Sequence, residues 1–176
     1  MLLTGVLLSG CSTNATTGRL QYNALTTEQE IALGSQAAPE LTQEYGGEVQ
    51  DPQLRGYIAQ VGQRMVPHTE GDAPSLPWEF VLLDSDVINA FALPGGKVFM
   101  SRGLAERMTN EAQLASVIGH EIGHVTARHV NDRITQTTVV QGILTVGIGL
   151  LGTASDSGML SAAAEQIVGA GGQGYL

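Results

Sequence analysis

The stretch "VIGHEIGHVTARHV", residues 117 to 130, concentrates polar chemistry in an otherwise apolar run. It carries three of the chain's four histidines, together with one glutamate and one arginine. Asn110 is a good N-terminal cap for a helix through this stretch, and Glu111 falls in the first turn, where the helix dipole favours a negative charge. Because an α-helix advances about 100° per residue, His120 and His124 are expected on one face, one turn apart.

Two imidazoles in that arrangement can bind one metal ion, and Glu121 stands beside the first of them. This is the H-E-x-x-H pattern of zinc peptidases. Zinc lowers the pKa of bound water to about 7, and the glutamate takes the proton during attack on a peptide carbonyl. The pattern therefore predicts His120 and His124 as ligands of one Zn²⁺ per chain, with Glu121 as the catalytic base. Gly119 and Gly123 are poor helix formers and predict that something packs closely here.

Two further polar residues follow the motif. On a straight helix, His129 lies about 140° from His124 and about 180° from His120, so it is interpreted as a structural histidine and not as a ligand. Arg128 lies four residues after His124, on the same side. It either pairs with a carboxylate near the site or is a solvated charge on the helix face.

Earlier segments predict two more helices and several strands. Thr26 or Thr27 caps the first helix, which Pro39 interrupts or kinks. Asp51 caps the second helix, with Pro52 at its first position. The apolar face of that helix is formed by Leu54, Ile58, Val61 and Met65. Strands are expected in "WEFVLLDS" (78–85), in "VINAFALPGG" (87–96, a strand and turn) and in "KVFMS" (97–101), followed by a short helix over 102–108.

Composition bounds the class of protein. The chain has 176 residues, of which 43% are hydrophobic and 14% charged, as expected for one folded domain. Seventeen acidic groups against eight basic ones give a net charge of −9. This charge argues against nucleic acid as a partner and against electrostatic docking to anionic lipid.

The N-terminus "MLLTGVLLSGC" resembles a bacterial lipoprotein signal that ends at a lipidated cysteine, Cys11, the only cysteine in the chain. The resemblance implies a signal peptide over 1–10, a polar tether over 11–25 and a folded domain over 26–176. Ser12 after the cysteine implies the outer membrane, with the protein held in the periplasm by its lipid. The sequence departs from the pattern because no Lys or Arg precedes the apolar run. The alternative is a buried free cysteine in an N-terminal helix.

Residues 89–104, "NAFALPGGKVFMSRGL", followed by 110–129, "NEAQLASVIGHEIGHVTARH", closely resemble the HtpX and CAAX prenyl protease family of zinc metallopeptidases. Residues 11–34 resemble its soluble periplasmic lipoprotein branch, the BepA-like proteins. The resemblance implies a gluzincin-like α+β domain, mostly helical, with a small β-sheet beside the H-E-x-x-H helix. It also implies that the segment after Pro94 is a sheet edge, which can bind substrate in extended form. The candidate substrate-binding residues are then Asn89, Gly95, Gly96, Lys97 and Val98.

The third zinc ligand of that family is a glutamate on a later helix, in an E-x-x-x-D-like motif after a serine-arginine pair. No such motif occurs in this sequence. We therefore expect the chain to be a C-terminally truncated fragment whose third ligand lies beyond residue 176, with Glu165 as the alternative ligand. The apolar run 139–151 is shorter than the roughly 20 residues of a membrane span. It is interpreted as a helical arm or a lid over a substrate cleft.

Together these observations predict a zinc-dependent endopeptidase that hydrolyses peptide bonds in misfolded or misassembled envelope proteins. Its partners would be polypeptide substrates, the membrane through the lipid at Cys11, and outer-membrane assembly machinery. The alternative is a non-catalytic lipoprotein that acts as a chaperone or scaffold and has an incomplete metal site.

Overall fold

The computed structural model describes residues 11–137. The predicted signal peptide over 1–10, the apolar run 139–151 and the candidate ligand Glu165 lie outside the described residues. The backbone of Cys11 is described as the first residue of a strand. Its lipidation stays a prediction.

The described elements follow one another as two short strands, two helices, three strands and two helices, with two turns of 3₁₀ helix between. They are β1 (Cys11–Thr13), β2 (Leu20–Tyr22), α1 (Thr27–Glu44), α2 (Pro52–Met65), η1 (Val66–His68), η2 (Ala73–Ser75), β3 (Glu79–Leu83), β4 (Ala90–Leu93), β5 (Lys97–Ser101), α3 (Arg102–Ala105) and α4 (Glu111–Thr126). Residues 129–137 are again helical. Within 11–137, no helix is both long and apolar enough to cross a bilayer.

A three-stranded sheet stands at the centre, in the order β3-β5-β4. Strand β5 runs parallel to β3 and antiparallel to β4, and all five of its residues are buried. Alternate side chains point to opposite faces of a strand. Accordingly Val98 and Met100 belong to one apolar cluster and Phe99 to another. Burial on both faces explains why β5 has no polar side that the sequence could reveal.

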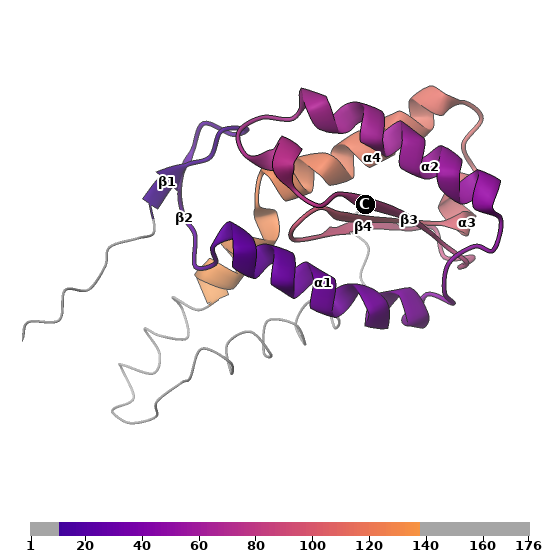
Figure 1. Cartoon of the computed structure of the whole chain (residues 1–176), viewed down its shortest axis with the longest axis horizontal. Helices are drawn as coiled ribbons and strands as arrows, with labels where there is room; N and C mark the ends of the chain where they lie inside the picture. The colour runs from indigo at the N-terminus through magenta and orange to yellow at the C-terminus, as the bar shows by residue number, and fades with distance from the viewer. Residues whose placement is uncertain (1–10, 138–176) are drawn as a thin grey trace, which may run out of the picture.

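Helices cover both faces of this sheet (Figure 1). Helix α1 covers one face, where Ala37 and Leu41 pack with Phe99. Helices α2 and α4 cover the other, where Ile58 and Ile118 pack in the larger cluster. The α+β class is confirmed. The small sheet lies between helical layers, and α4 contacts β4 and β5 directly.

The structure corrects two details of the predicted helices: an interruption at Pro39 and the place of Leu54 on an apolar face. Helix α1 continues through Pro39 to Glu44 without interruption. Pro39 itself is exposed, whereas Ala37 and Leu41 on either side of it are buried, so packing against the sheet holds the helix together across the proline. In α2, Leu54 is 51% exposed, so it does not join Ile58, Val61 and Met65 in packing on the core. The two caps, Thr26 and Asp51, are confirmed.

The segment predicted as a tether forms an antiparallel hairpin, β1–β2, over residues 11–22. Asn14 organises its turn: the side-chain oxygen accepts from the amides of Thr16 and Thr17, and Gly18 adopts a positive φ of 65°. The side-chain amide of Asn14 also donates to the carbonyl of Thr126, at 3.0 Å. The polar, turn-rich composition predicts a tether, because the hydrogen bond that fixes the hairpin to α4 joins residues 112 positions apart and leaves no local pattern.

Candidate metal centre

Helix α4 presents two different faces because of its spacing. Asn110 caps it as predicted, accepting from the amide of Gln113 at 3.0 Å. The apolar residues, spaced three and four apart, face the core and anchor the helix. They are Leu114, Ile118, Ile122 and Val125. The histidines of the motif lie off this stripe, His120 exposed and His124 half-buried.

The two rings converge as the helical spacing predicts. The Nε2 atoms of His120 and His124 are 3.0 Å apart, and the rings meet edge to face at 84° with centroids 4.6 Å apart. Two nitrogens bound to one tetrahedral zinc at about 2.0–2.1 Å are roughly 3.4 Å apart. A small adjustment of the side chains therefore lets both nitrogens bind one ion, so the pair fits zinc. Within residues 11–137, no group of three or more His, Cys, Asp or Glu side chains is placed to hold a metal.

Burial and charge set the protonation of the motif. Burial raises the pKa of Glu121, which is 8% exposed, while the neighbouring charge of His120 opposes the rise. Burial also lowers the pKa of His124, and the positive charges of His120, His129 and Arg133 lower it further. A neutral imidazole is the form that binds a metal. The surroundings of His124 therefore favour the ligand form.

The helix ends abruptly after the motif. Ala127 is its C-terminal cap, and Arg128 adopts a left-handed conformation with φ of 55°. The chain then starts a second helical segment at 129. The prediction for His129 assumed one straight helix, and this assumption is wrong because the chain turns at Arg128. The turn brings Nδ1 of His129 to 2.6 Å from Nδ1 of His124.

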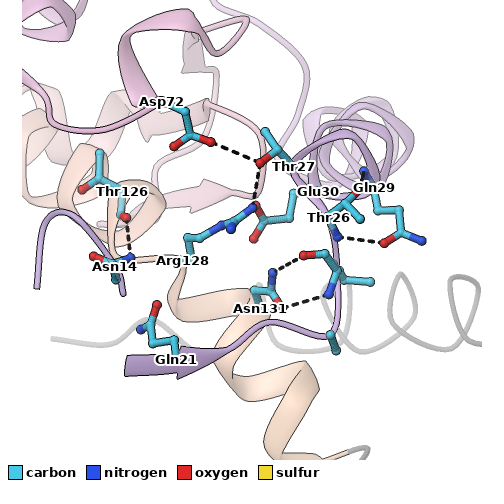
Figure 2. Close-up of polar contacts among 12 residues, drawn as sticks. Asn14, Gln21, Thr26, Thr27, Gln29, Glu30, Asp72, Thr126, Arg128 and Asn131 are labelled. Atoms are coloured by element: carbon cyan, nitrogen blue, oxygen red, sulfur yellow. Dashed lines mark hydrogen bonds and ion pairs between the residues drawn. The ribbon is translucent and has the colours of Figure 1, made fainter. Parts of the chain in front are cut away.

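Arg128 pairs with a carboxylate, as one of its two interpretations predicted. Its guanidinium donates twice to Oε2 of Glu30, from Nη2 at 2.7 Å and from Nε at 2.9 Å, and once to the hydroxyl of Thr27. Figure 2 shows this group, with Thr27 donating in turn to Asp72. The Glu30 side chain is only 9% exposed. Burial raises its pKa, although the hydrogen bonds from Arg128 oppose the rise.

Further contacts fasten the segments on each side of this turn. Asn14 donates to Thr126 and Gln21 donates to Ala127, so two carbonyls at the end of α4 are satisfied by the N-terminal hairpin. Asn131, fully buried, bonds the backbone of Leu25 in both directions (Figure 2). For Asn14 and Gln21 the sequence carries one signal, because a side-chain amide can donate to a free carbonyl at the end of a helix.

Two of the predicted substrate-binding residues, Lys97 and Val98, do not lie on a sheet edge. Strand β5, which begins at Lys97, is the central strand and is paired on both sides. Lys97 is buried and pairs with Glu79 at 2.8 Å. A Cβ on Gly95 would lie 2.5 Å from Cα of Ile31, so this glycine serves the close approach of α1. Correspondingly, Gly96 is packed on Trp78, Val98 is in the core, and the Asn89 side chain donates to the hydroxyl of Tyr45.

Strand β4 is an edge of the sheet, and it contacts the helix that carries the histidines, α4. It pairs with β5 alone among the described strands. A cavity lies where its C-terminal end meets α4 and the Arg128 turn. The lining includes Ala92, Leu93, Pro94, Thr27, Asp72, His124, Val125 and Val130. The two glycines of α4 differ in how closely their surroundings approach. A Cβ on Gly119 would lie 2.8 Å from Met65, so the predicted close packing is confirmed there. A Cβ on Gly123 would meet nothing within 4 Å, so close packing is not found at that position.

Comparison with known proteins gives consistent matches. The model of peptidase family M48 matches residues 52–175. The beta-barrel assembly-enhancing protease of Yersinia pestis is 32% identical over 187 aligned positions, covering 96% of this chain and 38% of that protein. Its Escherichia coli K12 namesake is 45% identical over 82 residues, which are 47% of this chain and 16% of that protein. The mitochondrial metalloendopeptidase OMA1 of Arabidopsis thaliana is 42% identical over 69 residues, 39% of this chain and 13% of that protein. The chain thus spans well under half the length of these relatives.

Proposed function

Because the chain belongs to peptidase family M48, we propose that it is a zinc-dependent endopeptidase with His120 and His124 as metal ligands and Glu121 as general base. One observation carries the proposal: the Nε2 atoms of His120 and His124 lie 3.0 Å apart, and the same helix buries Glu121, which lies between these two histidines in the sequence. A bound zinc ion supplies Lewis acidity, which polarises a carbonyl and lowers the pKa of water. The described residues supply two ligands, and the third is expected elsewhere.

The residues of the chain divide the remaining work. Glu121 accepts the proton of the attacking water and returns it to the leaving amine. Burial raises the pKa of its carboxyl, which brings the affinity of the carboxylate for a proton closer to that needed near neutral pH. The buried apolar residues of α4 anchor this helix to the core, so the two rings and the carboxylate are carried on one rigid element.

The substrate in this proposal is a polypeptide in extended form, bound along the edge of β4 that no other strand of residues 11–137 pairs with. An edge strand offers unpaired amides and carbonyls that bind any sequence through its backbone. The cavity beside His124 and the end of β4 then receives a side chain of the substrate. This assignment replaces β5, whose hydrogen bonds are already used on both sides.

Substrate class and location rest on the relatives. Several bacterial relatives are named as proteases that enhance β-barrel assembly. Their name, and the lipoprotein-like N-terminus ending at Cys11, support envelope proteins as substrates, outer-membrane assembly machinery as a partner, and a periplasmic location at the outer membrane. Misfolded or misassembled chains expose the extended segments that a β4 edge can pair with.

The test is Glu121→Gln, which keeps the shape of the side chain and removes the base. We expect zinc content equal to wild type and hydrolysis of an unfolded protein reduced by about 10²–10⁴-fold. The matched control is Glu111→Gln on the same helix, where the carboxylate is exposed and pairs with Arg64. Near-normal hydrolysis by Glu121→Gln would refute the assignment of the base. Wild-type protein that holds no zinc and cleaves nothing would favour the scaffold alternative.

A further inference from the structure

His129 is the one histidine of the opening stretch that the proposed mechanism leaves without a role. Its Nδ1 lies 2.6 Å from Nδ1 of His124, and the rings meet at 70° with centroids 4.8 Å apart. His124 therefore has a ring partner at each nitrogen: Nε2 faces His120 and Nδ1 faces His129.

Hydrogen-bond chemistry limits how these nitrogens share their protons. A neutral imidazole carries hydrogen on one nitrogen and a lone pair on the other. A contact of 2.6 Å between two Nδ1 atoms requires a hydrogen between them. When that hydrogen belongs to His124, Nδ1 donates to His129 and the lone pair of His124 is at Nε2, the atom that faces His120.

From this geometry we infer that His129 is a positioning residue: it accepts the Nδ1 hydrogen of His124 and thereby fixes the tautomer and ring orientation in which Nε2 is the metal ligand. The inference rests on the proposed metal centre. Metal-binding histidines usually donate their other ring hydrogen to a carboxylate, a carbonyl or water. Here a second imidazole takes that place, so the ligand is oriented without adding a negative charge next to it.

The fold explains how a residue five positions after His124 reaches it. A continued helix would carry His129 to the other side. The left-handed conformation of Arg128 redirects the chain, and the paired Glu30 holds Arg128 in place from α1. On the far side of His129, Asn131 is bonded to the backbone of Leu25. His129 is exposed, yet its backbone lies between two residues that are each fixed to a distant segment.

The first experiment reads the tautomer directly, in metal-free full-length chain labelled with ¹⁵N-histidine. Nitrogen chemical shifts and couplings distinguish a protonated ring nitrogen from one with a lone pair. We expect His124 to be protonated at Nδ1 in the wild type, and to shift toward the Nε2-protonated form in His129→Leu. A wild-type His124 protonated at Nε2 would overturn the inference.

The second experiment measures zinc affinity by competition with a chromogenic chelator. Loss of such a partner typically costs about 10–100-fold in metal affinity, which is the effect expected for His129→Leu. His129→Asn places an amide oxygen near the position of Nδ1 and should restore most of the affinity. Equal affinities in all three proteins, or an Asn variant as weak as the Leu variant, would refute the role of His129. Because His129 is exposed, urea unfolding should show the same stability for each.

A separate variant distinguishes an error in the role of His129 from an error in the proposed metal ligands. If His120→Ala leaves zinc affinity unchanged, the ligands proposed above are wrong, and the affinity arm for His129 fails with them. The tautomer of His124 in metal-free protein still decides whether His129 accepts its hydrogen.

Discussion

Replacing Arg128 separates two opposing energies in the turn that follows the H-E-x-x-H helix. With φ of 55°, the residue pays about 1–2 kcal/mol for a left-handed conformation that glycine adopts freely. Against this, removing one partner of a buried ion pair typically costs about 3–5 kcal/mol. The Glu30 side chain is 9% exposed and that of Arg128 21%, so solvent screens the pair little. Glu30 can escape part of the penalty by taking up a proton, which places the expected loss near the lower limit, about 3 kcal/mol.

Arg128→Ala should therefore lower the free energy of unfolding by about 3 kcal/mol, because it loses the pair and keeps the backbone strain. Arg128→Gly loses the pair but relieves the strain, so its loss should be about 1 kcal/mol smaller. Urea unfolding at neutral pH, followed by circular dichroism, measures both. An Arg128→Gly variant as stable as wild type would show that the pair with Glu30 contributes nothing. Equal losses for Ala and Gly would show that Arg128 carries no strain.

Three other perturbations test separate parts of the structure. Gly34→Ala should destabilise the protein by about 1–3 kcal/mol or more, because its Cβ would lie 2.0 Å from the carbonyl oxygen of Pro94. Gly123→Ala should instead stabilise α4 by about 1 kcal/mol, because its Cβ would meet nothing within 4 Å. The thermal unfolding temperatures of the two variants should therefore shift in opposite directions. Burial raises the pKa of Glu30 in the folded state, so the contribution of Glu30 to stability falls as the pH rises from the ordinary pKa of 4.5 through the raised pKa. Over that pH range, the free energy of unfolding of wild type relative to Glu30→Gln should decrease. An increase would mean that hydrogen bonding to Glu30 outweighs its burial. If Cys11 is lipidated, wild type should fractionate with membranes and carry acyl mass, Cys11→Ser should do neither, and a soluble wild type without acyl mass would contradict the anchor.

The parts of the fold that local chemistry determines were predictable from sequence. Asn110, Asp51 and Thr26 cap helices because their side chains reach amides two or three residues away, and such contacts can be read from spacing. The convergence of His120 and His124 follows equally from one helical turn. Each of these features depends on residues that are close in the chain.

The contacts that the sequence did not predict join residues that are far apart in the chain. No local rule connects Asn14 to Thr126 or Arg128 to Glu30, at separations of 112 and 98 residues. The straight helix expected through Arg128 was a reasonable default, since a non-glycine residue with positive φ is rare. Tertiary contacts overrode it. The central place of β5 could not be predicted, because pairing order cannot be deduced from a run of apolar residues.

The N-terminal hairpin has a consequence for how far the proposed enzyme can work from a bilayer. Asn14, bonded to the end of the H-E-x-x-H helix, is three residues from Cys11, a distance of about 10 Å at roughly 3.3 Å per residue. If acyl chains are attached at Cys11, only a short segment of chain separates them from the H-E-x-x-H helix. The proposed protease would then meet its substrates at the membrane surface, and its orientation toward that surface would be set by the strand that begins at the anchor.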